Sequence, residues 1–286
     1  MMLHALLEDL ALAPRVGDGA MGTMLYAKGV YIHRCYDEVT VSDPDLVRSV
    51  HAAYVRAGSE ILQTNSFGAN PVKLERHGLA ERTEEFNERA AILAREAAGD
   101  RACVAGSAGP LGIRIEPWGP TSVEEARALF RRQAEGLRAG GVDAFLLETF
   151  GDLSEVHAAM EAMRDVAPEL PLIVQMTVDR SGCSLYGTPP EIFGARLHAW
   201  GADVIGVNCG VGPHTMLEVL GRLREVTDRP LSVQPNAGPP RQVDGRTMLL
   251  CSPDYLEKFA RRFMEGGARL LGGCCGATPG HSRARA

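Results

Sequence analysis

The sequence predicts an α/β protein in which eight βα units close into one (β/α)8 TIM barrel. Three observations support this fold: eight short apolar runs at fairly even spacing, helical stretches between them, and glycine-rich junctions where a helix passes into a strand. The 286 residues, 45% of them hydrophobic and 23% charged, suffice for one large core. We therefore expect one domain over residues 1–286, with a doubly wound open sheet as the alternative architecture.

The apolar runs are continuous rather than alternating, which suits parallel strands that are buried on both faces. Most of them end in Gly, Asn, Glu or Cys, so polar side chains are expected where the strands end. The eight runs cover residues 16–18, 60–65, 102–106, 144–148, 172–176, 204–208, 231–235 and 269–273.

Helix signals lie between these runs. Asp43-Pro44 supplies an N-cap and a proline at the first helical position. The segment 121–124, Thr-Ser-Val-Glu, resembles a capping box. Helix ends at 57–60, 140–143, 201–203 and 266–269 place glycine directly before the next strand. Further helices are expected over the amphipathic segment 1–10 and from the starts at 154–155, 189–191 and 252–254.

The eighth unit is short, because only residues 279–286 follow its last glycines and cysteines. We expect its closing helix to be incomplete. This pattern is typical of a fragment, or of the front module of a longer protein.

Composition excludes several function classes. A net charge of −6 offers no general attraction to nucleic acid or to an anionic membrane. No apolar run approaches the ~20 residues of a spanning helix, and the N-terminus lacks the basic start of a signal peptide. Seven cysteines without secretion signals indicate a reducing compartment, so the cytoplasm is expected.

Three cysteines carry the clearest chemistry. Cys274 and Cys275 are adjacent and flanked by glycines, and Cys209 ends another apolar run. In a barrel these strand ends meet at one face, where three thiolates with one open position indicate a catalytic zinc site rather than a closed structural one. A lone strand-end cysteine is more often buried filler, but filler does not need the flanking glycines, which let backbone approach a ligand. We treat the remaining four as structural: Cys35, Cys103, Cys183 and Cys251.

Two acidic residues also fall at strand ends. Asp18 lies in a glycine-rich segment that matches the dinucleotide fingerprint weakly, and we expect a tight turn that exposes it. Glu148 ends a strand of apolar residues, where a carboxylate is costly unless it is paired. Together they could hold a cationic ligand group; the alternatives are a helix N-cap for Asp18 and a structural salt bridge for Glu148. Asn65 and Asn236 are polar strand-end residues that could equally be turn formers.

These motifs resemble the zinc-dependent homocysteine S-methyltransferases, a family that includes betaine-homocysteine methyltransferase and the homocysteine-binding module of cobalamin-dependent methionine synthase. The resemblance runs in order from residue 17 to 281 and is most similar to the methionine-synthase-like branch. It rests on Gly-Asp-Gly-Ala-Met-Gly-Thr, Gln-Thr-Asn-Ser-Phe-Gly-Ala-Asn, Leu-Glu-Thr-Phe, Gly-Val-Asn-Cys, Pro-Asn-Ala-Gly and Gly-Gly-Cys-Cys-Gly.

The resemblance implies a role for each matched position. Cys209, Cys274 and Cys275 would bind Zn²⁺, and Asp18 and Glu148 would receive the homocysteine ammonium. The substrate thiol would take the open position, so no catalytic residue is expected beyond the metal site. Further substrate contacts are expected at Asn65, at the backbone of Ala20, Ser66 and Phe67, and at Asn236, which would touch the metal or the sulfur.

Two other functions were weighed against methyl transfer. A zinc hydrolase would use the same open position, but its ligands are usually His and carboxylate, and the eight histidines form no H-E-x-x-H or H-x-H pattern. A homocysteine- or zinc-binding module without independent turnover is the second alternative. The methyl donor stays open: methylcobalamin, methyltetrahydrofolate or a sulfonium, with a cobalamin- or folate-binding module as a possible partner.

Overall fold

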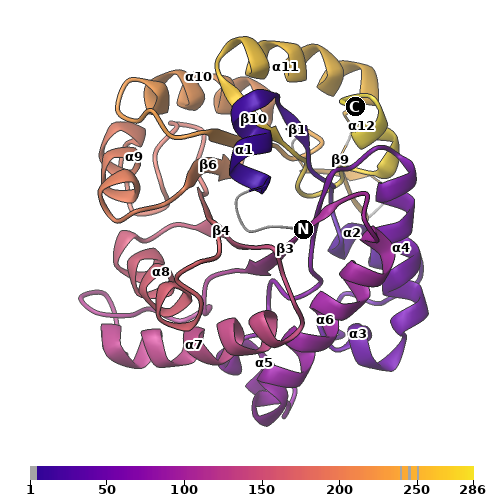
Figure 1. Cartoon of the computed structure of the whole chain (residues 1–286), viewed down its shortest axis with the longest axis vertical. Helices are drawn as coiled ribbons and strands as arrows, with labels where there is room; N and C mark the ends of the chain where they lie inside the picture. Colours follow the sequence, from indigo (N-terminus) through magenta and orange to yellow (C-terminus); the bar gives the residue numbers. More distant parts are fainter. Residues whose placement is uncertain (1–4, 239, 244–245, 250) are drawn as a thin grey trace.

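The computed structural model describes residues 5–238, 240–243, 246–249 and 251–286, and its centre is an eight-stranded parallel sheet that closes into a barrel (Figure 1). The strand order is β1-β10-β7-β6-β5-β4-β3-β2. This order confirms the predicted (β/α)8 barrel, and each strand falls on a predicted apolar run. The strands are β1 (Arg15–Val16), β2 (Ile61–Gln63), β3 (Cys103–Ala108), β4 (Ala144–Phe150), β5 (Leu172–Met176), β6 (Val204–Asn208), β7 (Leu231–Gln234) and β10 (Ala268–Leu271).

The barrel closes through a short join between β1 and β2. Gly17 pairs with Ile61 as an isolated parallel bridge, and the Asp18 N–H donates to the Ile61 carbonyl at 3.0 Å. On its other side β1 pairs with β10, and beyond the strands the Gly273 N–H donates to the Asp18 carbonyl at 2.9 Å. Closure therefore brings the first and last strand ends of the chain together.

Helices surround the barrel on its outer face (Figure 1). The helix start predicted at Asp43-Pro44 is confirmed, because the Asp43 carboxylate caps the Leu46 N–H at 3.2 Å. The helices are α2 (Gly22–Ala27), α3 (Val39–Ser42), α4 (Pro44–Arg56), α5 (Pro71–Glu75), α6 (Thr83–Ala98), α7 (Val123–Ala139), α8 (Leu153–Val166), α9 (Pro190–Ala199), α10 (Pro213–Arg224) and α11 (Pro253–Glu265), with a 3-10 turn, η1 (Ala80–Arg82).

Two predicted helix starts are wrong by one or two residues. The capping box of α7 joins Ser122 to Glu125, one position after the predicted pair, because the Ser122 hydroxyl accepts from the Glu125 N–H at 3.2 Å. Helix α8 is capped by Asp152, whose carboxylate accepts from the Ser154 N–H at 2.7 Å, so Ser154 lies inside the helix. The predicted glycine junctions are confirmed by positive φ angles at Gly58, Gly141, Gly201 and Gly267.

The N-terminal helix covers one end of the barrel. Of the predicted segment 1–10, residues 1–4 lie outside the described residues, and α1 (Ala5–Leu12) lies in front of the barrel in Figure 1. Leu6 and Leu10 are buried against inward side chains near the strand starts, among them Ile61 and Ala144. This apolar end leaves the opposite end, where the strands finish, for polar chemistry.

The eighth unit ends in a short helix, α12 (Pro279–Arg283), as expected from the sequence. Thr278 and His281 form a capping box at its start, and the second ring nitrogen of His281 lies 2.8 Å from the Cys251 carbonyl oxygen. Helix α12 packs against α11 and α4. The turn that carries Cys274 and Cys275 is therefore supported from behind.

One element was not predicted. A two-stranded antiparallel hairpin, β8 (Pro240–Val243) and β9 (Arg246–Leu249), lies between β7 and α11. The sequence signal was present, since the intervening Asp-Gly dipeptide is typical of tight hairpins. Among the described residues, no helix is long and apolar enough to cross a membrane.

Candidate metal and substrate site

The structure brings the three predicted cysteines together where β6 and β10 end. The sulfurs of Cys209, Cys274 and Cys275 lie within 4.8 Å of one another, and the Cys209 and Cys275 sulfurs are 4.0 Å apart. Tetrahedral zinc with bonds of about 2.3 Å places its sulfur ligands roughly 3.8 Å apart, so the spacing fits the ion. Within the described part of the chain, this is the one group of side chains with metal-ligand spacing.

Backbone hydrogen bonds from the end of β7 hold both cysteine segments. The Cys209 N–H donates to the Gln234 carbonyl at 3.1 Å, and the Cys274 N–H donates to the Pro235 carbonyl at 2.9 Å. The Ala237 N–H in turn donates to the Cys275 carbonyl at 2.9 Å. Cys209 adopts a φ of 57°, which a non-glycine residue keeps only when its surroundings impose it.

Glycines next to the cysteines are also required by packing. A Cβ on Gly272 would lie 2.7 Å from the Gln234 amide nitrogen. A Cβ on Gly273 would lie 2.3 Å from the Ala277 methyl and 3.0 Å from the Arg285 guanidinium. The turn can follow this path only because both residues lack side chains.

Without a metal, the three thiol groups share their protons unequally. Hydrogen bonds from Cys274 and Cys275 lower the pKa of Cys209 to about 3, with further help from the Gly210 amide and the Asn236 side chain. Donation to Cys209 raises the pKa of Cys275 to about 11 and also raises that of Cys274. A divalent cation that bound all three sulfurs would displace the protons of these two donors.

Asp18 lies inside the mouth of the barrel. The expectation that a tight turn would expose it is wrong. Its side chain is 2% exposed and accepts from the Gln63 N–H at 3.0 Å and from the Gln63 side-chain amide at 2.9 Å. Burial raises its pKa to about 8. At the adjacent Gly19 a side chain has no room, because a Cβ there would lie 2.6 Å from the Ala277 carbonyl oxygen.

Glu148 faces the same mouth from β4. Its carboxyl group accepts from the Ser107 hydroxyl and, at 3.1 Å, from the Asn208 side-chain amide. Burial raises its pKa to about 7, and the negative charge of Cys209 adds to the effect. Among the described residues neither Glu148 nor Asp18 forms an ion pair, so the structural salt bridge considered for Glu148 is absent there.

Asn208 connects the two halves of the site, and sequence reasoning did not select it. Its amide nitrogen donates to the Glu148 carboxyl group and, at 2.8 Å, to the Thr149 hydroxyl. The same nitrogen lies 4.0 Å from the Cys274 sulfur. Its amide oxygen accepts from the Thr149 N–H at 2.7 Å, which holds Thr149 at a φ of 65°. Its place directly before Cys209 at a strand end was the available signal.

The two other predicted asparagines differ in their surroundings. The Asn236 side chain lies close enough to Cys209 to lower the pKa of its thiol, and the Asn236 amide oxygen is buried without a partner among the described residues. Asn65 instead donates to the Tyr36 carbonyl at 2.8 Å and to the Thr40 hydroxyl at 3.0 Å. Asn236 thus belongs to the metal cluster, whereas the Asn65 amide nitrogen fixes a loop.

Three backbone amides were predicted to hold a carboxylate. The Ala20 N–H already donates to the Ala277 carbonyl at 3.0 Å, and the Ser66 N–H donates to the Thr64 carbonyl at 2.9 Å. For the Phe67 N–H no acceptor is found among the described residues. Of the three amides, that of Phe67 is therefore available to a ligand.

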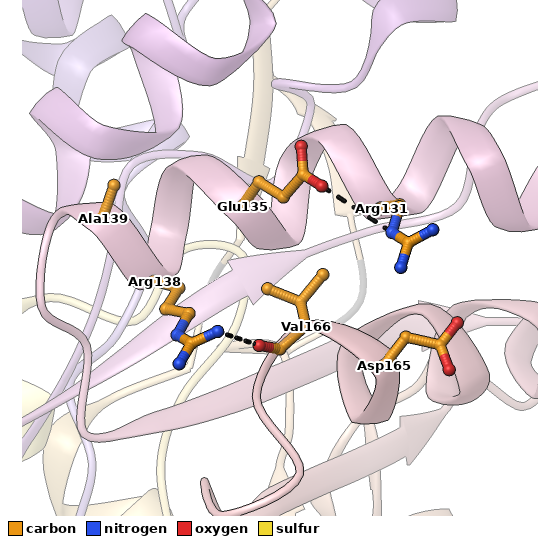
Figure 2. A pocket seen from close by; sticks show the side chains of 6 residues that line it. All are labelled: Arg131, Glu135, Arg138, Ala139, Asp165 and Val166. Carbon is orange, nitrogen blue, oxygen red and sulfur yellow. Dashed lines mark hydrogen bonds and ion pairs between the residues drawn. The ribbon is translucent and has the colours of Figure 1, made fainter.

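Two cavities lie outside this cluster. One of about 460 Å³ lies on the outer helical layer between α7 and α8, where Arg131 pairs with Glu135 and Arg138 donates to the Val166 carbonyl (Figure 2). Its other charged residues pair outside the cavity, Asp165 with Arg127 and Arg138 with Glu169, and it lies away from the strand ends. The other, of about 940 Å³, adjoins Cys209 and is lined by Arg180, Gly210, Val211, Gly212, Pro213, His214, Thr215, Gly238, Cys251, Ser252 and Tyr255.

Comparison with known proteins gives consistent matches. A family model described as homocysteine S-methyltransferase matches residues 15–286. The methionine synthases of Mycobacterium leprae (strain TN) and Mycobacterium tuberculosis (strain ATCC 25618 / H37Rv) are each 34% identical over 295 residues and cover 97% of this chain. The match covers 24% and 25% of those two proteins, so the chain spans about a quarter of their length.

Solved structures agree with these sequence matches. The metallated form of the homocysteine methyltransferase MmuM from Escherichia coli superposes with a TM-score of 0.84 at 29% identity, covering 99% of this chain and 98% of that one. The oxidized form of the same protein gives a TM-score of 0.81, with 99% and 97% covered.

The raised pKa of Asp18 predicts how stability depends on pH. Asp18 ionises near its ordinary 3.8 in the unfolded chain but near 8 in the metal-free fold, so the folded protein keeps a proton that the unfolded chain loses. The stability due to this proton is complete below pH ~4 and is lost as pH rises toward ~8. Between pH 5 and 8, urea unfolding should show wild type losing roughly 3 to 4 kcal/mol more than Asp18→Asn.

The control is Asp100→Asn, since Asp100 is exposed and forms no ion pair among the described residues. Its pH profile should follow that of wild type. If the Asp18→Asn profile also ran parallel to that of wild type, Asp18 would not hold an uncompensated charge in the fold.

Proposed function

Because the chain belongs to the homocysteine S-methyltransferase family, we propose that it transfers a methyl group to the sulfur of homocysteine and yields methionine. The observation that carries the proposal is a three-cysteine cluster beside two buried carboxyl groups that form no ion pair among the described residues. Homocysteine joins a thiol to an ammonium by a short carbon chain, so its thiol suits the cysteine cluster and its ammonium suits the two carboxyl groups. We take residues 1–286 as one such domain, with the cytoplasm as its compartment.

The metal in this proposal is zinc, held by Cys209, Cys274 and Cys275. A three-thiolate donor set is typical of zinc, and the sulfur spacing supports that choice. When bound, zinc supplies Lewis acidity that lowers the pKa of a thiol at its remaining position. Asn236 and Asn208, whose amides lie against Cys209 and Cys274, orient the cluster.

Asp18 and Glu148 are proposed to bind the substrate ammonium. Burial destabilises each carboxyl group as an anion, and a bound cation would relieve that cost. Ser107 and Asn208 fix the direction of Glu148, and Gln63 fixes that of Asp18. The Phe67 N–H would donate a hydrogen bond to the substrate carboxylate.

Methyl transfer then needs no general base from the chain. On binding, the substrate thiol would release its proton to solvent, so the sulfur would meet the methyl carbon as a nucleophilic thiolate. The donor keeps the electron pair of the bond that breaks. The chain's own task is to hold the sulfur and the ammonium in one orientation beside the cavity next to Cys209.

The methyl donor and the partner modules are open within this proposal. Methylcobalamin, methyltetrahydrofolate and a sulfonium are the candidate donors, and the 940 Å³ cavity beside Cys209 gives any of them an approach. The second candidate function is a homocysteine-binding module that acts only with a cobalamin- or folate-binding partner. The chain matches only about a quarter of the length of the two methionine synthases, which favours this second function.

Removal of one cysteine tests the metal ligands. We expect about one zinc per chain in wild type, and well under one in Cys275→Ala, measured by elemental analysis after dialysis against a weak chelator. Cys183→Ala is the matched control, because Cys183 lies outside the cluster and should leave zinc unchanged. Full, tightly bound zinc in Cys275→Ala would rule out the ligand assignment.

Turnover is tested with zinc-loaded protein, homocysteine and a donor panel of methylcobalamin, methyltetrahydrofolate, S-methylmethionine, S-adenosylmethionine and betaine. At least one donor should give methionine. Glu148→Gln keeps a polar side chain for Asn208 but loses the charge, so it should raise the KM for homocysteine about tenfold or more.

The thiol 4-mercaptobutanoate, which lacks the amine, is the internal control. Its KM should be the same in wild type and Glu148→Gln. An equal loss with both thiols would contradict ammonium binding by Glu148, and methionine from no donor would leave the non-catalytic module as the function.

A further inference from the structure

The last residues of the described chain reach back to the cysteine turn. Arg285, just beyond α12, donates from one terminal nitrogen to the Gly272 carbonyl at 2.6 Å and from the other to the Ser282 hydroxyl at 3.1 Å. Its Nε atom is shielded from solvent and has no partner among the described residues. A guanidinium in this setting is costly to bury, so its position calls for a physical reason.

Arg285 can approach the turn because Gly273 has no side chain. A Cβ on Gly273, the residue before Cys274, would lie 3.0 and 3.3 Å from the two terminal nitrogens of Arg285. The guanidinium therefore lies directly against the backbone that leads into Cys274 and Cys275. A substitution at Arg285 would therefore alter the packing against this backbone.

Arg285 also brings a positive charge to the Asp18 side of a region rich in acidic groups, whereas Lys73 acts on Glu148. It forms no ion pair with the described residues, although Asp18 is close enough to influence it. Burial lowers its pKa to about 10, which leaves it charged at neutral pH. Tyr54, its other neighbour, donates its hydroxyl to the Ala277 carbonyl at 2.7 Å, just beyond the cysteine pair.

We propose that Arg285 is a positioning residue of the metal site: it holds the Gly272–Cys275 turn and offsets the negative charge that three thiolates leave on a zinc site. This inference rests on the proposed function, because it assumes that the cysteines bind zinc. Arg285 acts through the backbone and through its charge and does not touch the substrate.

The test compares three full-length variants. Arg285→Met removes the charge and the hydrogen bond, Arg285→Lys keeps the charge, and Arg283→Met changes an exposed arginine of α12 as the matched control. Zinc affinity is measured by competition with a chromophoric chelator, and ligand geometry by the absorption of the cobalt(II)-loaded protein. Neither measurement depends on turnover.

We expect Arg285→Met to bind zinc about tenfold more weakly and to shift the cobalt–thiolate band, since groups that orient metal ligands typically contribute on this scale. Arg285→Lys should recover most of the affinity, and Arg283→Met should equal wild type. If Arg285→Met does not fold, Arg285→Gln, which is neutral but keeps a donor for Gly272, takes its place.

Wild-type affinity in the neutral variant, or an equal loss in Arg285→Lys and the neutral variant, would overturn the proposal. A wild-type protein that binds no zinc would instead refute the proposed function itself. The two failures are therefore distinguishable.

Discussion

The concentration of buried acidic groups at the mouth of the barrel is the constraint on which the rest of the site depends. Three thiol groups and two carboxyl groups converge there, and no lysine or arginine among the described residues forms an ion pair with either carboxyl group. Burying such groups as anions is costly, which explains why the metal-free structure favours protons on Asp18, Glu148 and two of the cysteines. A divalent metal and a ligand ammonium would each remove part of that cost. Selectivity for an amino thiol would then follow from the empty site's own electrostatics.

The fold supplies this convergence by simple means. Parallel strands in a closed barrel end at one face, and closure between β1 and β2 brings Asp18 to the turn that follows β10. The end of β7 ties the Cys209 segment to the Cys274–Cys275 turn through backbone hydrogen bonds. Asn208 then links Glu148 to Cys274, so the part proposed for the ammonium and the part proposed for the metal are mechanically connected. Movement of either part would disturb the other.

Much of this arrangement could be predicted from the sequence, because continuous apolar runs mark buried parallel strands and a barrel aligns their ends. The remainder depends on side-chain direction, which residue type does not determine. Asn65 and Asn208 both lie at strand ends, yet one amide nitrogen bonds a loop and the other bonds Glu148. Asp18 was expected on an exposed turn, but its carboxyl group is buried and bonded by the Gln63 backbone and side-chain amides. Arg285 gave no sequence signal, since its position depends on how the chain after α12 folds back onto Gly272 and Gly273.

The central claim is that one metal ion, held by three cysteine sulfurs, takes the substrate sulfur as its fourth ligand. X-ray absorption spectroscopy at the zinc edge tests it most directly, because it counts sulfur neighbours at about 2.3 Å. The account predicts three sulfurs in the zinc-loaded protein and four after homocysteine is added. Fewer than three sulfurs at the start, or an unchanged count with homocysteine bound, would contradict it.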